Sequence, residues 1–116
     1  MMKKNKGQKL WKKAKNIIPG GSMLFSKKSE LHLPEKWPCY YSKSSGYHVW
    51  DLDNNKYIDM MFMVGTNILG YCNNEVDNAV RKAVSNGIMT SFNCFEEVKL
   101  AEKLISIHPW SDMARF

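Results

Sequence analysis

The amino-acid sequence predicts an α+β fold, in which an N-terminal helix precedes a three-stranded antiparallel meander and two further helices. Apolar residues recur at helical spacing in three separate segments. Between the first and second of these lie short runs rich in Tyr, Val, Trp and Ile, separated by turn-forming Gly, Ser, Asn and Asp. With 116 residues, 44% of them hydrophobic, the chain has the size and composition of one small globular domain.

The first helix is predicted to run from Gln8 to Ile18 and to pack one face against a larger body. Lysines lie outside its apolar stripe, and the sequence Pro19-Gly20-Gly21 ends it. An irregular loop is predicted over residues 22–38, where prolines recur. The stripe has the spacing i, i+1, i+4, i+7, i+8 and consists of Leu10, Trp11, Ala14, Ile17 and Ile18.

Three short segments are predicted to form the meander: Cys39–Lys43, Tyr47–Leu52 and Lys56–Met60. The first turn is expected at Ser44-Ser45-Gly46 and the second at Asp53-Asn54-Asn55, because Gly and Asn tolerate the positive φ that tight turns require. Such a meander is stable only when one of its faces is covered.

Two more helices are predicted, from Asn74 to Asn86 and over Phe95–His108. Asn74 is the expected N-cap of the first, and Gly87 is expected to end it in the left-handed conformation. The last residues, 113–116, have the composition of an opening strand. Because a strand needs partners, we expect the chain to be the front part of a longer fold.

The net charge of +6 is concentrated at the N-terminus. Residues 1–28 hold nine lysines and no acidic residue, whereas the rest of the chain has a net charge of −3. A basic arm of this kind binds nucleic acid or an acidic partner in some proteins. The amphipathic pattern favours a solvated first helix, and the small basic binding module stays as an alternative. A degenerate remnant without activity is a further alternative.

The cysteines and the hydropathy pattern exclude several classes of protein. Cys39, Cys72 and Cys94 lie far apart and form no zinc-ligand spacing with the three histidines, so no metal site is expected. Three free thiols suit a reducing cytoplasm. The basic N-terminus lacks the apolar core of a secretory signal, and the longest apolar run, residues 60–64, is too short to span a membrane. We expect a cytoplasmic protein without membrane contact.

Several motifs are similar, in order and spacing, to the N-terminal part of one enzyme family. They are Ile18-Pro19-Gly20-Gly21, Gly46 with Val49-Trp50-Asp51-Leu52-Asp53 and Tyr57-Ile58-Asp59, then Ile68-Leu69-Gly70, and finally Arg115-Phe116. Together they resemble the class III aminotransferases, which use pyridoxal 5'-phosphate and include the glutamate-1-semialdehyde aminomutases. The resemblance extends over nearly all of the chain from Trp11 onward.

This resemblance implies a domain organisation. The N-terminal amphipathic helix would occupy residues 1–19, and the loop and meander of the small domain would occupy residues 20–72. Residues 73–116 would form helices at the start of the large α/β domain of a fold type I pyridoxal phosphate enzyme, truncated at Phe116. The phosphate-binding turn and the Schiff-base lysine of the family would follow that point. By resemblance the chain therefore carries no catalytic and no cofactor-binding residue.

The resemblance also implies the reaction and the candidate site residues. The parent enzyme would move an amino group between small donor and acceptor substrates through a lysine aldimine, as a homodimer and without a nucleic-acid partner. In relatives the loops 20–27 and 63–66 line the substrate entrance. The substrate-pocket candidates are therefore Ser22, Lys27, Gly65 and Thr66, with Lys27 as a contact for a carboxylate or phosphate.

Other residues admit two interpretations, and a few depart from the family pattern. Asp51, Asp53 and Asp59 are interpreted as turn residues rather than as metal ligands or acid–base groups. Leu24 and Val64 replace Ser and Trp of the aminomutases, which argues against glutamate-1-semialdehyde as the substrate. Packing between strands is favoured over base stacking for the aromatic side chains Trp37, Tyr40, Tyr41, Tyr47 and Trp50.

Overall fold

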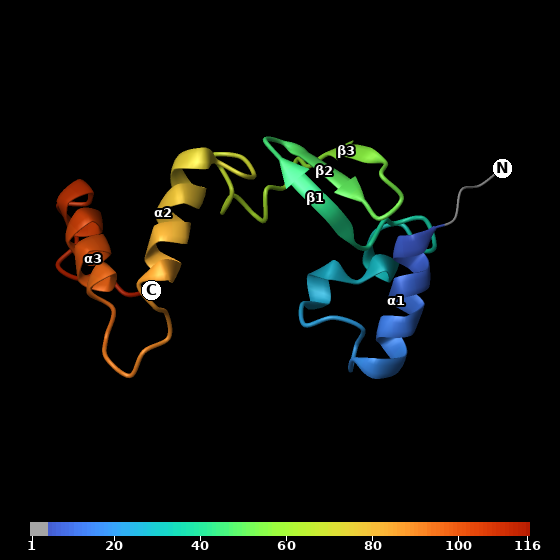
Figure 1. Ribbon diagram of the computed structural model, residues 1–116, viewed down its shortest axis with the longest axis horizontal. Coiled ribbons are helices and arrows are strands. Elements are labelled where there is room, and N and C mark those ends of the chain that lie inside the picture. The colour runs from blue at the N-terminus through green and yellow to red at the C-terminus, as the bar shows by residue number, and fades with distance from the viewer. Residues whose placement is uncertain (1–4) are drawn as a thin grey trace. The chain divides into compact units, whose positions relative to one another are not determined.

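The computed structural model describes residues 5–116, and it confirms the predicted α+β architecture. The chain forms two compact units, Met1–Ala79 and Val80–Phe116. The elements, labelled in Figure 1, are α1 (Lys6–Ile17), the 3-10 turns η1 (Phe25–Lys27) and η2 (Ser29–Leu31), the strands β1 (Tyr41–Ser45), β2 (His48–Asp51) and β3 (Lys56–Ile58), and the helices α2 (Asn74–Ser85) and α3 (Phe95–Ile107).

Helix α1 begins two residues before its predicted start because Asn5 caps it. The Asn5 side chain accepts a hydrogen bond from the Gln8 amide at 3.1 Å. The first helical residue, Lys6, is held to the turn between β2 and β3, where its amide donates to an Asp53 carboxylate oxygen at 2.8 Å. Its ammonium group donates to the Leu52 carbonyl at 3.1 Å. Helix α1 ends one residue early, since Ile18 is extended.

The apolar contact of α1 is narrower than its sequence stripe predicts. Of the predicted stripe residues, Trp11 and Ala14 are buried, and they are the buried hydrophobic residues of the part of the chain that the structure describes. The other stripe residues, Leu10, Ile17 and Ile18, are 40%, 68% and 43% exposed. Only the Trp11 side of the helix meets the loop that follows it.

Polar bonds fix that loop against α1. The side-chain amide nitrogen of the buried Gln8 donates to the Ser29 hydroxyl at 2.9 Å and to the Trp37 carbonyl at 2.6 Å. The Trp11 indole nitrogen donates to a Glu30 carboxylate oxygen at 3.0 Å. Because buried polar groups are costly when unpaired, these bonds specify how the loop lies on the helix.

The three strands form the predicted antiparallel meander in the order β1-β2-β3. Strand β1 begins at Tyr41 rather than Cys39, because Cys39 has a φ of +62° that no strand accommodates. The first turn is shorter than predicted, since Ser45 already pairs with His48. Its two residues are Gly46 and Tyr47, with φ of +56° at Gly46, which suits the first position of a tight hairpin turn.

The second turn is built around Asp51. Its carboxylate accepts bonds from the amides of Asp53 at 2.9 Å and Asn55 at 2.8 Å, and from the Tyr57 hydroxyl at 3.0 Å. Asn54 takes a φ of +69°, as the sequence analysis expected. Burial alone would raise the pKa of Asp51, but these hydrogen bonds outweigh burial and hold the pKa below its usual value. Strand β3 then ends at Ile58, two residues earlier than predicted.

Helix α2 starts as predicted at Asn74, but its cap is the preceding residue. Asn73 accepts bonds from the amides of Glu75 at 3.1 Å and Val76 at 3.2 Å, so the prediction of Asn74 as the N-cap is wrong. Gly87 has the predicted left-handed φ of +96°. Helices α2 and α3 each end one residue before their predicted ends. Residues 113–116 form no strand, because no described segment pairs with them.

Candidate functional site

The segment that follows β3 is tied back to the sheet through Tyr71. The Gly46 amide donates to the Tyr71 carbonyl at 2.9 Å, and the Tyr71 amide donates to the Gly46 carbonyl at 2.7 Å. A side chain on Gly70 would come within 3.2 Å of the Gly46 oxygen, so glycine permits this close approach. The sequence Ile68-Leu69-Gly70 thus precedes a point where two backbones meet.

A hydrogen bond between side chains closes the same segment. The Tyr71 hydroxyl donates to an Asp59 carboxylate oxygen at 2.5 Å, and the other oxygen accepts from the amides of Met61 and Phe62. The bond from Tyr71 is the largest cause of the lowered pKa of Asp59, and it raises the pKa of Tyr71 to about 12. The Phe62 ring stacks on Tyr71 with centroids 5.7 Å apart. Asp59 therefore acts as a turn residue.

The closed segment contains a run of left-handed backbone. Phe62, Met63, Val64 and Gly65 have φ values of +42°, +50°, +58° and +87°. Residues with a side chain pay about 1–2 kcal/mol each for this conformation. The Gly65 amide donates to the carbonyl of Phe62 at 3.1 Å, and a Cβ at Gly65 would meet open space. Gly65 is thus the unstrained end of a strained turn.

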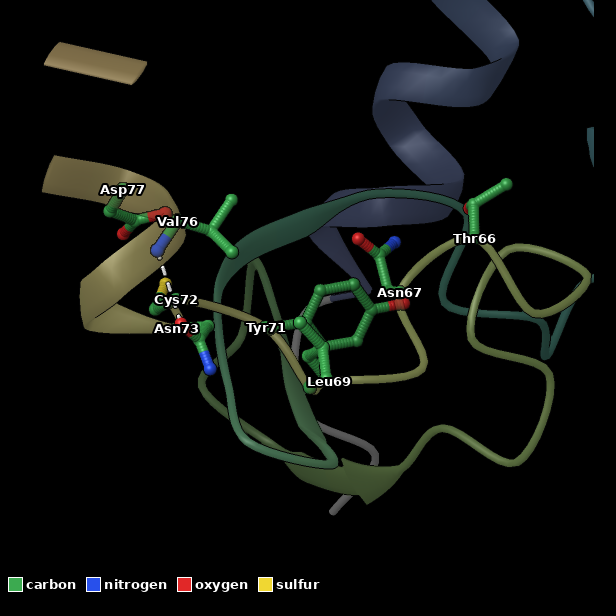
Figure 2. A pocket seen from close by; sticks show the side chains of 9 residues that line it. Thr66, Asn67, Leu69, Tyr71, Cys72, Asn73, Val76 and Asp77 are labelled. Atoms are coloured by element: carbon green, nitrogen blue, oxygen red, sulfur yellow. Dashed lines mark hydrogen bonds between the residues drawn. The ribbon is translucent and has the colours of Figure 1, made fainter. Parts of the chain in front are cut away.

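A small open cavity lies beside this turn, at the start of α2. Its volume is about 150 Å³. Figure 2 shows the side chains that line it and the hydrogen bond between Asn73 and Val76 at its α2 end. The Thr66 hydroxyl donates to the Met63 carbonyl at 2.9 Å, which holds Thr66 at the turn. The polar lining residues are Thr66, Asn67, Tyr71, Asn73 and Asp77.

The structure places the four predicted pocket residues in two separate loops. Thr66 lines the cavity, and Gly65 lies next to it. The Ser22 hydroxyl donates to the Leu24 carbonyl at 2.8 Å, and Lys27 is the exposed last residue of η1. Within residues 5–116, no hydrogen bond or ion pair joins either of these two residues to the 65–66 turn.

Sequence reasoning missed four of the polar residues around the cavity. Asn67, Tyr71, Asn73 and Asp77 were not among its candidates. Tyr71 carried a usable signal, because it directly follows Ile68-Leu69-Gly70. The role of Asn73 was open to prediction as well, since either of two consecutive asparagines can cap a helix. For Asn67 and Asp77 the sequence held no comparable signal.

A second cavity, of about 360 Å³, lies between α1 and the loop after it. Its lining includes Lys15, whose ammonium group lies 2.7 Å from a Glu30 carboxylate oxygen, together with Lys28 and Trp11. The bond from Lys15, followed by the bond from Trp11, lowers the pKa of Glu30 to about 2. This ion pair already satisfies Lys15, so Lys28 is the remaining cation at this cavity.

The first cavity by itself does not fit pyridoxal phosphate. Such a cofactor needs a lysine beside a phosphate cradle, typically free amides at a helix N-terminus. The first cavity lies at the start of α2 but has no lysine or arginine in its lining. The Asn73 side chain already occupies two amides there, and Glu75 and Asp77 bring negative charge. The first cavity therefore forms no cofactor site of its own.

The fold and the sequence both match one family of enzymes. The family model for class III aminotransferases matches residues 32–116, which is most of the chain. The chain therefore belongs to the class III aminotransferases and corresponds to an N-terminal segment of them. Pyridoxal phosphate is the cofactor of this family.

Curated relatives support this assignment along the whole chain. A glutamate-1-semialdehyde 2,1-aminomutase of Methanothrix thermoacetophila is 33% identical over 115 residues, which are 99% of this chain and 26% of that protein. The protein of the same name from Francisella tularensis is 35% identical over 118 residues and covers 100% of this chain and 27% of its own length. The chain thus spans about a quarter of the length of the curated relatives it matches.

Two solved structures share the fold. The FumI protein of Sphingopyxis sp. MTA144, solved in its pyridoxal phosphate internal aldimine form, has a TM-score of 0.77 and 29% sequence identity, and the match covers 89% of this chain and 24% of FumI. An omega-transaminase from Sphaerobacter thermophilus has a TM-score of 0.73 and 21% identity, and the match covers 90% of this chain and 23% of the transaminase. The second likeness bears on the fold alone.

No helix in the described part of the chain is long and apolar enough to cross a membrane.

Proposed function

We propose that this chain is the N-terminal segment of a cytoplasmic, homodimeric, pyridoxal phosphate-dependent enzyme that transfers an amino group. The observation that carries the proposal is the family match over residues 32–116, supported by relatives that align with nearly the whole chain. The reaction class follows from the family, whose model describes aminotransferases and whose curated relatives bear the name of an aminomutase.

Within such an enzyme the segment would supply one edge of the substrate pocket. Thr66 supports this role, because its side chain lines the cavity beside the strained turn and Gly65 shapes that turn. Ser22 and Lys27 would contribute from the loop after α1. The exposed Lys27 ammonium is suited to bind a substrate carboxylate or phosphate.

We favour an aminotransferase over a glutamate-1-semialdehyde aminomutase. The curated relatives bear the aminomutase name. However, Leu24 and Val64 stand where the resemblance implies Ser and Trp for the aminomutases. Both positions lie in the two loops that hold the candidate residues. A change of size and polarity at a pocket edge alters which substrate fits. The substrates would be a small amino donor and a small carbonyl acceptor.

The segment would not catalyse the reaction alone. Its cavity at α2 lacks a cation for the cofactor phosphate and a lysine for the cofactor carbonyl. Those groups would come from the part of the family fold that these 116 residues do not match. The described residues would shape the pocket edge and hold it against the sheet through the Tyr71 bridge.

A chimera tests the proposal. Residues 1–116 replace the matching segment of the Francisella tularensis relative, and the purified chimera is examined for the visible absorbance of the bound cofactor and for amino transfer with a panel of donors. We expect a yellow dimer with transaminase activity. The changes Thr66→Ala and Lys27→Gln are expected to raise KM severalfold and to leave the absorbance unchanged.

The unaltered Francisella relative, produced in the same way, is the control. A colourless and inactive chimera beside a yellow and active control would contradict the proposed function. Normal activity with an unchanged KM for both variants would leave the family role intact and show that these two residues do not touch the substrate.

A further inference from the structure

One face of the meander combines aromatic rings with lysines. Lys43 of β1 and Lys56 of β3 both pair with Trp50 of β2, so the three side chains share a face. His48 lies two residues before Trp50 and projects on the same side. Tyr47, in the hairpin turn, extends the row. We call Lys43, Tyr47, His48, Trp50 and Lys56 the basic-aromatic face.

The rings of this face lie in contact with one another. The ring centroids of Tyr47 and His48 are 4.0 Å apart, and those of His48 and Trp50 are 5.9 Å apart. Tyr47 is 54% exposed, so much of this residue is open to solvent. Partial burial, with a smaller contribution from the Lys56 ammonium group, lowers the pKa of His48 and so favours its neutral imidazole. The row therefore offers uncharged rings for stacking.

Two cations flank the row. The Lys43 ammonium nitrogen lies 4.7 Å from the Trp50 ring centroid, and that of Lys56 lies 5.5 Å from it. Among the described residues, neither Lys43 nor Lys56 forms an ion pair with an acidic side chain, so the positive charge of these two lysines is not neutralised. Both side chains are held by the tryptophan but remain exposed.

The negative charge of the sheet lies on its opposite face. Asp51 follows Trp50 in β2 and therefore projects to the other side, where its carboxylate bonds with the Tyr57 hydroxyl. No acidic residue occurs among the strand residues that share the face with Trp50. With a net charge of +6 for the whole chain, a polyanion would be attracted to the molecule before any contact forms.

We propose that the basic-aromatic face binds single-stranded nucleic acid, with a base stacked on Tyr47 and backbone phosphates held by Lys43 and Lys56. Proteins that bind single strands combine a positive surface with aromatic rings, because every base has a face that stacks. The meander has both features within adjacent strands, which Figure 1 shows side by side. The proposal does not depend on the proposed aminotransferase role.

The composition of the face favours nucleic acid over a protein partner. The centres of protein–protein interfaces are depleted in lysine and carry apolar anchors. Here two unneutralised lysines flank the central ring, and His48 and Trp50 are partly buried in the row while Tyr47 is exposed. A duplex presents its bases already stacked, so Tyr47 would have no partner in it.

The test measures fluorescence anisotropy of a labelled 12-nucleotide oligothymidine with the 116-residue chain over a series of salt concentrations. We expect saturable binding that is at least tenfold tighter than binding to a duplex of the same length. Tyr47→Ala should weaken binding about 5- to 100-fold, and Tyr47→Phe should restore it, because the ring and not the hydroxyl stacks. Lys43→Gln/Lys56→Gln should reduce the salt slope by about 1.4.

Lys82→Gln/Lys103→Gln is the matched control, because it removes the same charge from exposed positions on α2 and α3. Circular dichroism confirms that each variant keeps its secondary structure. The proposal is overturned if the control variant loses as much affinity as Lys43→Gln/Lys56→Gln, or if the duplex or polyglutamate binds as tightly as the oligothymidine. It is also overturned if a mononucleotide competes as strongly as the oligothymidine at the same nucleotide concentration. Absence of binding at 50 mM salt also overturns it.

Discussion

At the scale of single residues, two contacts explain how the first unit holds its shape. Gly21, with a φ of +80°, lets the loop after α1 pass over Trp11, because a Cβ there would lie 2.7 Å from the indole ring. The bond from Tyr71 to Asp59 closes the segment that carries the cavity. In both cases a small or polar residue permits a close approach between segments distant in sequence.

Gly21→Ala is expected to lower the free energy of unfolding by about 2–4 kcal/mol, from overpacking against Trp11 and the left-handed backbone cost. Urea denaturation followed by tryptophan fluorescence measures it. Gly65→Ala is the control, since Gly65 also has a positive φ but its Cβ would meet open space. That change should cost only about 1 kcal/mol. Equal losses of unfolding free energy in the two variants would show that the contact with Trp11 does not contribute to the cost of Gly21→Ala.

Tyr71→Phe is expected to remove one late step from the alkaline titration of the tyrosines. The hydrogen bond to Asp59 raises the pKa of Tyr71 to about 12, above its ordinary 10.0. Because the pKa is raised in the folded state, the hydrogen bond from Tyr71 to Asp59 also stabilises the folded chain. This contribution to stability is fully present below pH 10 and is lost as the pH rises toward 12. Absorbance at 295 nm follows the step. An unchanged titration near pH 12 in the variant would assign the step to another tyrosine.

At the scale of elements, the ends of helices and strands depended on local chemistry that periodicity does not show. The helical spacing of apolar residues predicted all three helices, and Gly87 predicted the end of α2. Asn73 and Asn74 are chemically identical candidates for the cap, so composition alone does not separate them. Likewise, β1 begins later than predicted because the backbone of Cys39 is left-handed. Cysteine has no preference for that conformation, so the sequence does not indicate it.

Asn73→Ala is expected to destabilise the chain by about 1 kcal/mol, because the amides of Glu75 and Val76 lose their acceptor. Circular dichroism at 222 nm during thermal unfolding measures the effect. Asn74→Ala is the control at the neighbouring position and should change stability by less than about 0.5 kcal/mol. A larger loss from Asn74→Ala than from Asn73→Ala would place the cap at Asn74, as the sequence analysis predicted.

At the scale of the whole molecule, polar bonds carry much of the structure and the apolar core is small. Trp11 and Ala14 are its buried hydrophobic members among residues 5–116, whereas Val76, Val80 and Val84 of α2 are about half exposed. Carboxylates hold the loop after α1, the second turn and the segment after β3. The stability of the chain should therefore depend strongly on these carboxylates remaining ionised.

Acid is expected to unfold the chain between about pH 4.5 and pH 2. Glu30 has its pKa lowered from 4.5 to about 2 by Lys15 and Trp11, and Asp51 and Asp59 also have lowered pKa values. A lowered folded-state pKa gives stability that is present above the unfolded pKa and lost as the pH falls through the folded one.

Glu30→Gln tests this acid dependence. The difference in urea midpoint between the native chain and this variant should be largest at pH 7, shrink as the pH falls from 4.5, and disappear only below about pH 2, where the carboxylate becomes protonated. A difference that stays constant with pH would contradict the role of the Glu30 charge. Glu97→Gln, at an exposed position in the first turn of α3, is the control for the loss of a charge.

The candidate site shows where sequence reasoning reached its limit. The family motifs directed attention to Gly65 and Thr66, and the structure places Thr66 at a cavity. The motifs also named Ser22 and Lys27, which the described contacts do not bring to that cavity. Tyr71 was not among the predicted site residues. Its bond to Asp59 joins positions twelve residues apart, and residue pattern alone does not predict such a pair.

The sequence by itself determined the family, the three helices and the meander, because periodicity, turn residues and motif order are local properties of the chain. Only the tertiary structure decided which apolar residues of α1 are buried, which asparagine caps α2 and which side chains share a face of the sheet. Strand register alone brings Lys43, Trp50 and Lys56 together. These outcomes depend on contacts between distant segments, whose free energies no local pattern contains.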